Sequence, residues 1–349
     1  MIIIILIVAG IIAVIELRKS SDITLALARQ KTMYLARQQA QYWDGRMNGY
    51  INVLRSLSNI MNFYESLEPS TRRQTYEDTI QSVFEDMPDF VRIFTVWKPN
   101  AIDGMDVRNI GRAGSTPAGQ FAFSVTRESG EVKVMTSAAV QETMEYITGS
   151  ASRAVIMSDP VPFKNQGKDT YCVRITVPIL NKRLNEVVGA VGCQLDIAMI
   201  QPIVIQTIKD NDEVTSMVIY SDNGFILANY LPEFIGKKIE TETQYGQYLD
   251  KVIYAIKNAE EYECFAYDPE LKQNMAIAIV NIPIGASPTT WSVMTGSTEK
   301  YIMREVNAMK KFVVFLAVLA LAAAAALIYL VLNSAARPIV RVDCPRRDG

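Results

Sequence analysis

The sequence contains no histidine among its 349 residues. Without an imidazole, the chain cannot form a Ser-His-Asp triad or a Cys-His pair, and it cannot contain a zinc site with histidine ligands. The four cysteines show no Cys-x-x-Cys spacing, so they indicate neither a zinc ribbon nor a redox pair. The 35 Lys and Arg nearly balance the 37 Asp and Glu, which gives no general attraction for nucleic acid. We therefore expect no enzyme, no bound metal and no cofactor.

Charged residues are also absent from 312–332, and this stretch is almost wholly apolar. At about 1.5 Å per residue it would extend roughly 31 Å, the thickness of a bilayer's hydrocarbon core. A buried core helix is rarely apolar on every face over such a length. We predict a transmembrane helix over 310–332. The apolar start (1–17) lacks a basic leader and a clear cleavage site, and it indicates a first, uncleaved transmembrane helix.

Residues 18–68 contain no proline, and Pro69, directly after them, is the first stop signal. The pattern up to 67 predicts one long stalk helix. Apolar residues recur in it with alternating steps of four and three, as in a heptad seam: Trp43, Met47, Tyr50, Leu54, Leu57, Met61 and Tyr64. Such a stripe can cover the protein's own sheet or pair with a second copy in a homodimer. The spacing leaves both interpretations open.

Beyond Phe90 the pattern changes to short β-rich runs that come in two batches, each accompanied by helices. Helices are predicted over 197–209, with Pro202 near the first turn, and over 244–258. Strands in two batches favour antiparallel sheets rather than a doubly wound parallel sheet. The fold class is therefore α+β, with two tandem antiparallel-sheet modules over 69–210 and 211–305.

Polar loop residues and cysteines in these modules allow more than one role. Asn100, Asp103 and Asp106 do not have the spacing of an EF-hand loop, and turn capping is favoured over calcium binding. Cys172 and Cys193 lie on runs that can be neighbouring strands, so a disulfide is conceivable, although we favour free thiols.

Motifs across about 30–300 resemble the double Cache extracellular sensor domain of bacterial methyl-accepting chemotaxis receptors, in a spirochaete-like version. This resemblance implies that the two modules are PAS-like, the first membrane-distal and the second membrane-proximal. The motifs of the distal module are TVWKPNAIDGMD (95–106), GQFAFSVTR (119–127), SDPVPF (158–163), TVPI (176–179) and VVGAVGCQLDI (187–197). Those of the proximal module are YSDNGFILAN (220–229), IGKK (235–238) and TTWSVM (289–294). ARPIV (336–340) resembles the opening of a HAMP linker, so 333–349 is expected to be a truncated HAMP segment.

The resemblance implies that a small molecule binds in the distal module, between an apolar or aromatic wall and a few polar groups. The candidate residues on matched positions are Trp97, Phe123, Arg127, Tyr146, Phe163 and Asp196. Trp97 and Phe123 would form the wall, Arg127 would pair with a carboxylate, and Asp196 would accept hydrogen bonds from an ammonium group. Of the family's amino-acid-binding motif only Tyr146 and Asp196 are kept, which leaves the ligand class open.

The resemblance further implies a two-pass protein of the bacterial inner membrane, in contact with lipid, with about 18–311 in the periplasm. Ligand binding would displace helices and signal to a cytoplasmic domain in chemotaxis. The alternative outputs are a histidine kinase or a nucleotide cyclase. A membrane-anchored surface protein without any output is the remaining alternative.

Overall fold

The computed structural model describes residues 2–128, 131–149, 153–165, 167–211, 214–269, 271–285 and 287–336. The chain divides into two compact units. One combines Met1–Gln30 with Glu299–Gly349, and the other is Lys31–Thr298. Nearly all of the predicted HAMP segment lies outside the described residues.

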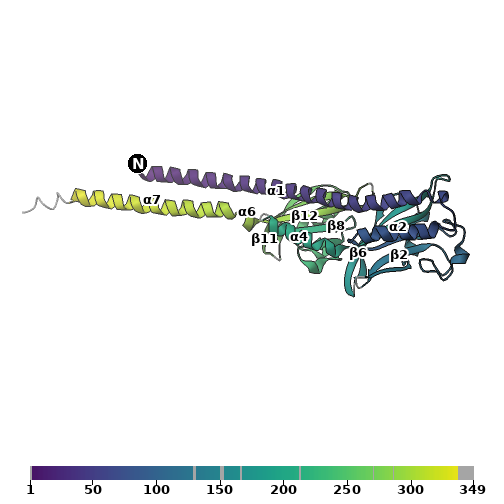
Figure 1. The fold of residues 1–349 in the computed structure, drawn as a ribbon. Helices are drawn as coiled ribbons and strands as arrows, with labels where there is room; N and C mark the ends of the chain where they lie inside the picture. The colour runs from purple at the N-terminus through teal and green to yellow at the C-terminus, as the bar shows by residue number, and fades with distance from the viewer. Residues whose placement is uncertain are drawn as a thin grey trace, which may run out of the picture. The chain divides into compact units, whose positions relative to one another are not determined.

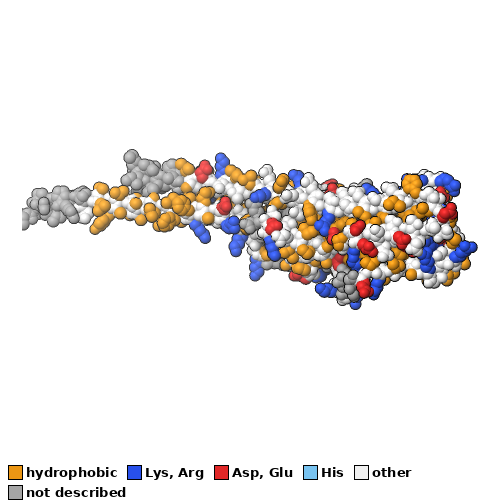
Figure 2. Space-filling view, viewed as in Figure 1, with side chains coloured by type: hydrophobic (Ala, Val, Ile, Leu, Met, Phe, Trp, Pro, Cys, Tyr) orange, Lys and Arg blue, Asp and Glu red, His pale blue; other side chains and the backbone are white. Residues whose placement is uncertain are grey.

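The first unit contains the start of α1 (Ile2–Met61), the short α6 (Glu299–Ile302) and α7 (Arg304–Ala336). Within the described residues, one helix is long and apolar enough to cross a membrane, over Arg304–Val331 of α7. Its apolar side chains are exposed, as a lipid-facing helix requires. Figure 2 shows hydrophobic side chains along α7. The predicted second span is thus placed on a suitable helix, whereas the predicted first span at 1–17 forms the start of α1 and stays a prediction.

The distal module of the second unit contains a sheet in which all neighbours are antiparallel, in the order β3-β2-β1-β7-β6-β4, with β5 also paired to β6. Its elements are α2 (Arg72–Asp86), β1 (Phe90–Trp97), β2 (Ala122–Glu128), β3 (Glu131–Thr136), α3 (Val140–Thr148), β4 (Ile156–Met157), β5 (Val161–Asn165), β6 (Lys168–Asn181), β7 (Glu186–Asp196) and α4 (Gln201–Asp210). Figure 1 shows α1 and α2 running beside this sheet.

The proximal module contains a second antiparallel sheet in the order β10-β11-β12-β8-β9. Its elements are β8 (Ser216–Ser221), β9 (Ile226–Asn229), α5 (Leu249–Lys257), β10 (Tyr262–Asp268), β11 (Gln273–Pro283) and β12 (Thr290–Thr298). Asp222-Asn223-Gly224 forms the β8–β9 turn, where Gly224 has a φ of +75° that favours glycine. The expected architecture of one long helix followed by antiparallel-sheet modules is confirmed.

The heptad seam of α1 packs inward. All seven of its members are buried, at 5% exposure or less, and they belong to the same hydrophobic core as both sheets. Trp97 on β1 contacts Tyr64, whose ring centroid lies 5.1 Å away in an edge-on geometry. The seam therefore covers the protein's own sheets, and it is not available for pairing with a second copy along 43–64.

The two modules are connected by side-chain hydrogen bonds at Asp159, which lies between β4 and β5. Its carboxylate accepts hydrogen bonds from Ser221 Oγ at 2.9 Å and from Asn223 Nδ2 at 3.0 Å, both in the proximal module. Nearby, Gln201 on α4 donates to the Asn229 carbonyl oxygen at 2.6 Å. The modules thus meet through polar contacts.

Replacing Asp159 by alanine is expected to lower the free energy of unfolding by roughly 1–2 kcal/mol, because Ser221 is buried and loses its acceptor. Denaturation of the chain in lipid nanodiscs, followed by tryptophan fluorescence, measures this. Asp169→Ala is the control, since that carboxylate is 88% exposed and makes only a long ion pair with Lys164. Equal stabilities of the two variants would contradict the role of Asp159.

Candidate ligand-binding face of the distal module

The distal sheet has two faces, which its strands supply alternately. On β1, Ile93 and Trp97 point to the face that packs against α1 and α2, which we call the helix face. Phe94 and Val96 point to the opposite face and pack with Ala122 and α3. Because α3 packs on β1 and β7, we call this second side the lid face.

Polar side chains form a continuous row across the lid face. The strand registers place Arg174 (β6) opposite Gln194 (β7), Gln194 opposite Arg92 (β1), and Arg92 opposite Thr126 (β2). Lys133 on β3 follows Thr126. Side chains directly opposite each other on neighbouring strands lie close enough to contact. The row therefore spans the sheet beneath and beside α3.

Several buried polar atoms of this face have no hydrogen-bond partner among the described residues. They are Ser124 Oγ, Thr143 Oγ1, Arg174 Nε and Gln194 Oε1. A buried polar atom without a partner costs about 1–3 kcal/mol, so proteins rarely leave several on one face. A bound polar molecule or ordered water would satisfy them. This concentration marks the lid face as the candidate binding site.

The charged groups of the lid face are held in defined positions. Arg174 Nη1 donates to Glu142 on α3, and the Arg174 guanidinium lies 5.8 Å from the centre of the Phe94 ring. The Arg92 guanidinium lies 5.7 Å from the centre of the Phe163 ring. Burial raises the pKa of the Cys172 thiol to about 11, although the nearby Arg174 and Arg92 charges lower it. Cys172 is thus a neutral wall group of this face at pH 7.

The equivalent interior of the proximal module contains a hydrogen-bonded network around Glu242. Glu242 accepts hydrogen bonds from Tyr220 at 2.5 Å, Asn229 at 2.7 Å and Gln244 at 2.9 Å. Tyr220 and Tyr245 share a hydrogen bond, and burial raises the pKa of each well above its ordinary value. Each of these groups thus has a hydrogen-bond partner within the network, whereas Gln273 Oε1 and Asn281 Oδ1 elsewhere on the proximal sheet have none among the described residues.

Half of the site residues expected from the sequence lie on the helix face instead. Trp97 and Phe123 are fully buried in the core against the helices. Arg127 donates to the Phe84 and Met87 carbonyl oxygens at the end of α2 and to the Phe90 carbonyl oxygen at the start of β1. Because these side chains point away from the lid face, the structure does not bring them to the candidate site, and Arg127 serves to cap α2.

The other three expected residues lie on the lid face or at its edge. Tyr146 on α3 packs on Val187 and Ala190, and its hydroxyl donates to the Ala154 carbonyl oxygen at 2.5 Å. Phe163 contacts Arg92, as described above. Asp196 ends β7, where it accepts hydrogen bonds from Thr170 Oγ1 at 2.7 Å and from Ala198 N at 2.8 Å. The bond from Ala198 N shows that Asp196 caps the following helical turn.

Sequence reasoning missed Arg92, Ser124, Arg174 and Gln194. Each is a polar residue with an apolar residue directly before and after it in a strongly β-forming run. This alternation could have indicated polar side chains on one face of the sheet. The expectation that the cysteines are free thiols is confirmed for Cys172 and Cys193. Although β6 and β7 are neighbours, Cys172 lies opposite Asp196 and Cys193 opposite Ile175, which puts them on different faces.

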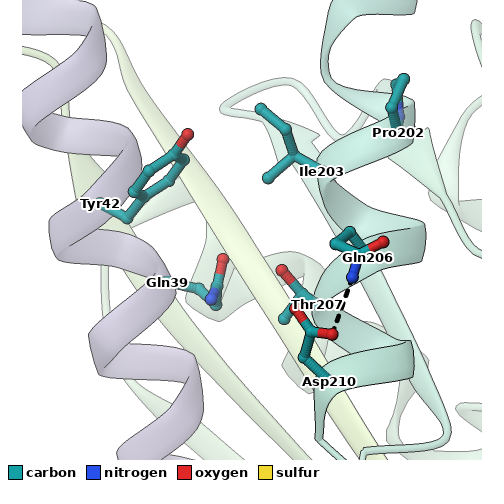
Figure 3. A pocket seen from close by; sticks show the side chains of 7 residues that line it. All are labelled: Gln39, Tyr42, Pro202, Ile203, Gln206, Thr207 and Asp210. Carbon is teal, nitrogen blue, oxygen red and sulfur yellow. Dashed lines mark hydrogen bonds between the residues drawn. The ribbon is translucent and has the colours of Figure 1, made fainter.

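A second hollow lies between α1 and α4. It has a volume of about 450 Å³, and it is lined by Gln39, Tyr42, Pro202, Ile203, Gln206, Thr207 and Asp210. Figure 3 shows Gln39 and Tyr42 on α1 facing the side chains of α4, with Gln206 hydrogen-bonded to Asp210. This hollow is open, and its one carboxylate is already engaged, so it offers a ligand less than the lid face does.

No protein-family model matches the chain, and no curated protein matches it. Among solved structures, it is similar to the extracellular domain of mmHK1S-Z3, a protein assigned as a histidine kinase. The identity is 19% and the TM-score 0.68, over 81% of this chain and 98% of that one. The periplasmic sensory domain of the Campylobacter jejuni chemoreceptor Tlp1 matches with 15% identity and a TM-score of 0.62, over 80% and 98%.

The ligand-binding domain of the Pseudomonas aeruginosa PAO1 amino acid chemoreceptor PctC, solved in complex with GABA, matches with 12% identity. Its TM-score is 0.51, over 76% of this chain and 96% of that one. At these identities the likeness concerns the fold. It agrees with the resemblance that the sequence motifs indicated. Residues 31–298 of this chain have the double Cache fold of extracellular sensor domains.

Proposed function

We propose that this chain is the sensor region of a transmembrane receptor that binds a small extracellular solute on the lid face of its distal module. The observation that carries this proposal is the group of buried polar atoms on that face without hydrogen-bond partners among the described residues. The fold supports it, since the similar structures are extracellular or sensory domains.

Transmission would follow the chain itself. Both sheets pack on α1, and β12 continues directly into α6 and α7. A ligand that prefers one packing of the sheet against α1 would shift the population of that arrangement. α7, and the start of α1 as a first span, would place 18–311 outside the inner membrane. Protease added to spheroplasts should then degrade the Lys31–Thr298 unit, and protection of that unit would argue against this topology.

The candidate outputs are a methyl-accepting signalling domain for chemotaxis and, as alternatives, a histidine kinase or a nucleotide cyclase. The sequence motifs favour the first. The likeness to the extracellular domain of mmHK1S-Z3 favours the kinase. The coding sequence downstream of residue 349 distinguishes them, since paired helical heptads would support chemotaxis and a catalytic domain would support the kinase or the cyclase.

A homodimer through α1 is also proposed, along a surface different from the heptad seam. Tyr34 and Tyr42 on α1 are 64% and 44% exposed, and they are available to a second copy. Sedimentation of the chain in detergent should yield a dimer. A monomer at all concentrations would count against it.

The direct test of ligand binding is a thermal-shift screen of the chain in nanodiscs against amino acids, organic acids, polyamines, purines and sugars. A ligand at about 100 times its Kd stabilises the protein by about 2.7 kcal/mol, which moves the midpoint by degrees. A shift that is lost in Gln194→Leu would locate binding on the lid face. A shift that is unchanged in this variant would remove the lid face from consideration.

A further inference from the structure

The row across the lid face is rich in positively charged side chains. It contains Arg174, Arg92 and Lys133, with neutral Gln194 and Thr126 between them and no carboxylate among these five residues. Neighbouring strands lie about 4.8 Å apart, so the backbones at Arg92 and Arg174 are roughly 10 Å apart. Two guanidinium groups on long side chains can converge on one small molecule across that distance.

Carboxylates near the row are already engaged. Glu142 is 61% exposed and bonds Arg174 Nη1, whereas Arg174 Nε is buried and has no hydrogen-bond partner among the described residues. The pair with Glu142 therefore orients the guanidinium and leaves its Nε edge for another acceptor. Asp196 accepts from Thr170 and Ala198 N. The Nε edge of Arg174 thus offers a donor to an anion, whereas these two carboxylates already accept hydrogen bonds from the protein.

The remaining groups of the face suit a small organic molecule. Ser124 and Thr143 supply hydroxyl groups that can donate, and Gln194 supplies an amide. Phe94 lies closely over Gly192, where a Cβ would come within 2.5 Å of its ring. Phe94 and Phe163 thus give apolar surface beside the two guanidinium groups. Aromatic walls with a few placed polar groups are typical of small-molecule sites.

We propose that the lid face binds a small organic acid, whose carboxylate is held by Arg92 and Arg174. This inference rests on the binding site proposed above and names its ligand class. The planar fork of a guanidinium matches a carboxylate with two parallel hydrogen bonds. Gln194 lies between the two arginines. Together with Ser124 and Thr143, it forms hydrogen bonds with the neutral part of the ligand.

Isothermal titration calorimetry of the full chain in nanodiscs tests this with pyruvate, lactate, succinate and malate. Phosphate, glutamate, putrescine and glucose represent a different anion, a zwitterion, a cation and a neutral solute. At least one of the four organic acids is expected to bind. Arg92→Gln and Arg174→Gln should each weaken it by about 10- to 100-fold, because each removes a charge-assisted hydrogen bond. Arg108→Gln is the matched control, since Arg108 is exposed on a distal loop, and its Kd should equal that of the wild type.

The outcomes separate this inference from the proposed function. Binding of putrescine or glucose, lost in Gln194→Leu but not in the arginine variants, overturns the organic-acid inference and leaves the lid face as a ligand site. The same holds if phosphate or glutamate alone binds. An organic acid that binds equally to wild type and both arginine variants overturns the assignment of Arg92 and Arg174. If none of the eight solutes binds, the inference fails. Circular dichroism of each variant establishes that it is folded.

Discussion

Replacing Arg73 by alanine is expected to lower the free energy of unfolding by about 3–5 kcal/mol. Arg73 lies on α2 with 3% of its side chain exposed. Its guanidinium donates to Asp103 at 2.7 Å and to Asp106 at 2.6 Å, and these carboxylates are 3% and 7% exposed. Alanine would leave two buried carboxylates without their cation.

The arginine also holds the loop that follows β1. Arg73 Nη1 donates to the Gly119 carbonyl oxygen at 2.8 Å and to Ser115 Oγ at 3.1 Å. Asn100 and Asp106 bond each other's backbone N–H groups. The loss of Arg73 therefore loosens α2 and the whole loop together. Arg108→Ala is the control, because this arginine lies on the same loop but is exposed. Denaturation in nanodiscs measures both, and a loss below about 1 kcal/mol for Arg73→Ala would contradict the buried-pair argument.

At acidic pH, the free energy of unfolding should depend on pH differently in the wild type and in Arg73→Ala. Burial by itself would raise the pKa of Asp103, but the hydrogen bonds from Arg73 and Met105 N and the Arg73 charge outweigh it and lower that pKa below its ordinary value of 3.8. A carboxyl whose pKa is lowered on folding stabilises the protein above its unfolded pKa, and this stabilisation disappears as the pH falls through the folded pKa. Wild type should therefore lose this stabilisation below about pH 4, whereas Arg73→Ala should not.

The same loop shows how far sequence reasoning extends. The expectation that Asn100, Asp103 and Asp106 cap turns is confirmed, because their side-chain oxygens bond nearby backbone N–H groups. Their common cation, Arg73, was not predicted. It lies about thirty residues earlier on a separate helix, and only the tertiary packing of α2 on the loop brings it there. The local sequence pattern is enough to predict the turn, whereas the charge pairing depends on a long-range contact.

The candidate site repeats this division. The alternation in the strands correctly indicates two faces, and the β-rich runs were correctly placed. The pattern does not indicate which face the long helix covers, because both faces of these strands are apolar enough to be buried. Trp97 and Arg127 were expected to contact a ligand because they stand on positions matched to the family, yet they lie on the helix face. Arg92 and Gln194 lie on the lid face and become neighbours only through the β1–β7 register.

Trp97 provides the second large effect, because it separates a structural role from a ligand-binding one. Its side chain is fully buried between Tyr64, at 5.1 Å in an edge-on contact, and Tyr76, at 6.1 Å in a stacked one. Truncating a buried tryptophan to alanine leaves a large cavity, and the free energy of unfolding is expected to fall by about 3–5 kcal/mol. Denaturation in nanodiscs, followed by fluorescence of the remaining tryptophans, measures this loss.

Trp97→Phe is the decisive companion, because it keeps an aromatic ring between α1, α2 and β1. The indole Nε1 has no hydrogen-bond partner among the described residues, so phenylalanine removes volume without breaking a polar contact, and a loss of only about 1–2 kcal/mol is expected. At a temperature where both proteins are folded, the affinity for a lid-face ligand should not change. A weakened Kd at nearly unchanged stability would instead mean that Trp97 forms part of the ligand's wall, and the binding site would then have to lie on the helix face. The two readouts together decide which face of the distal sheet senses the solute.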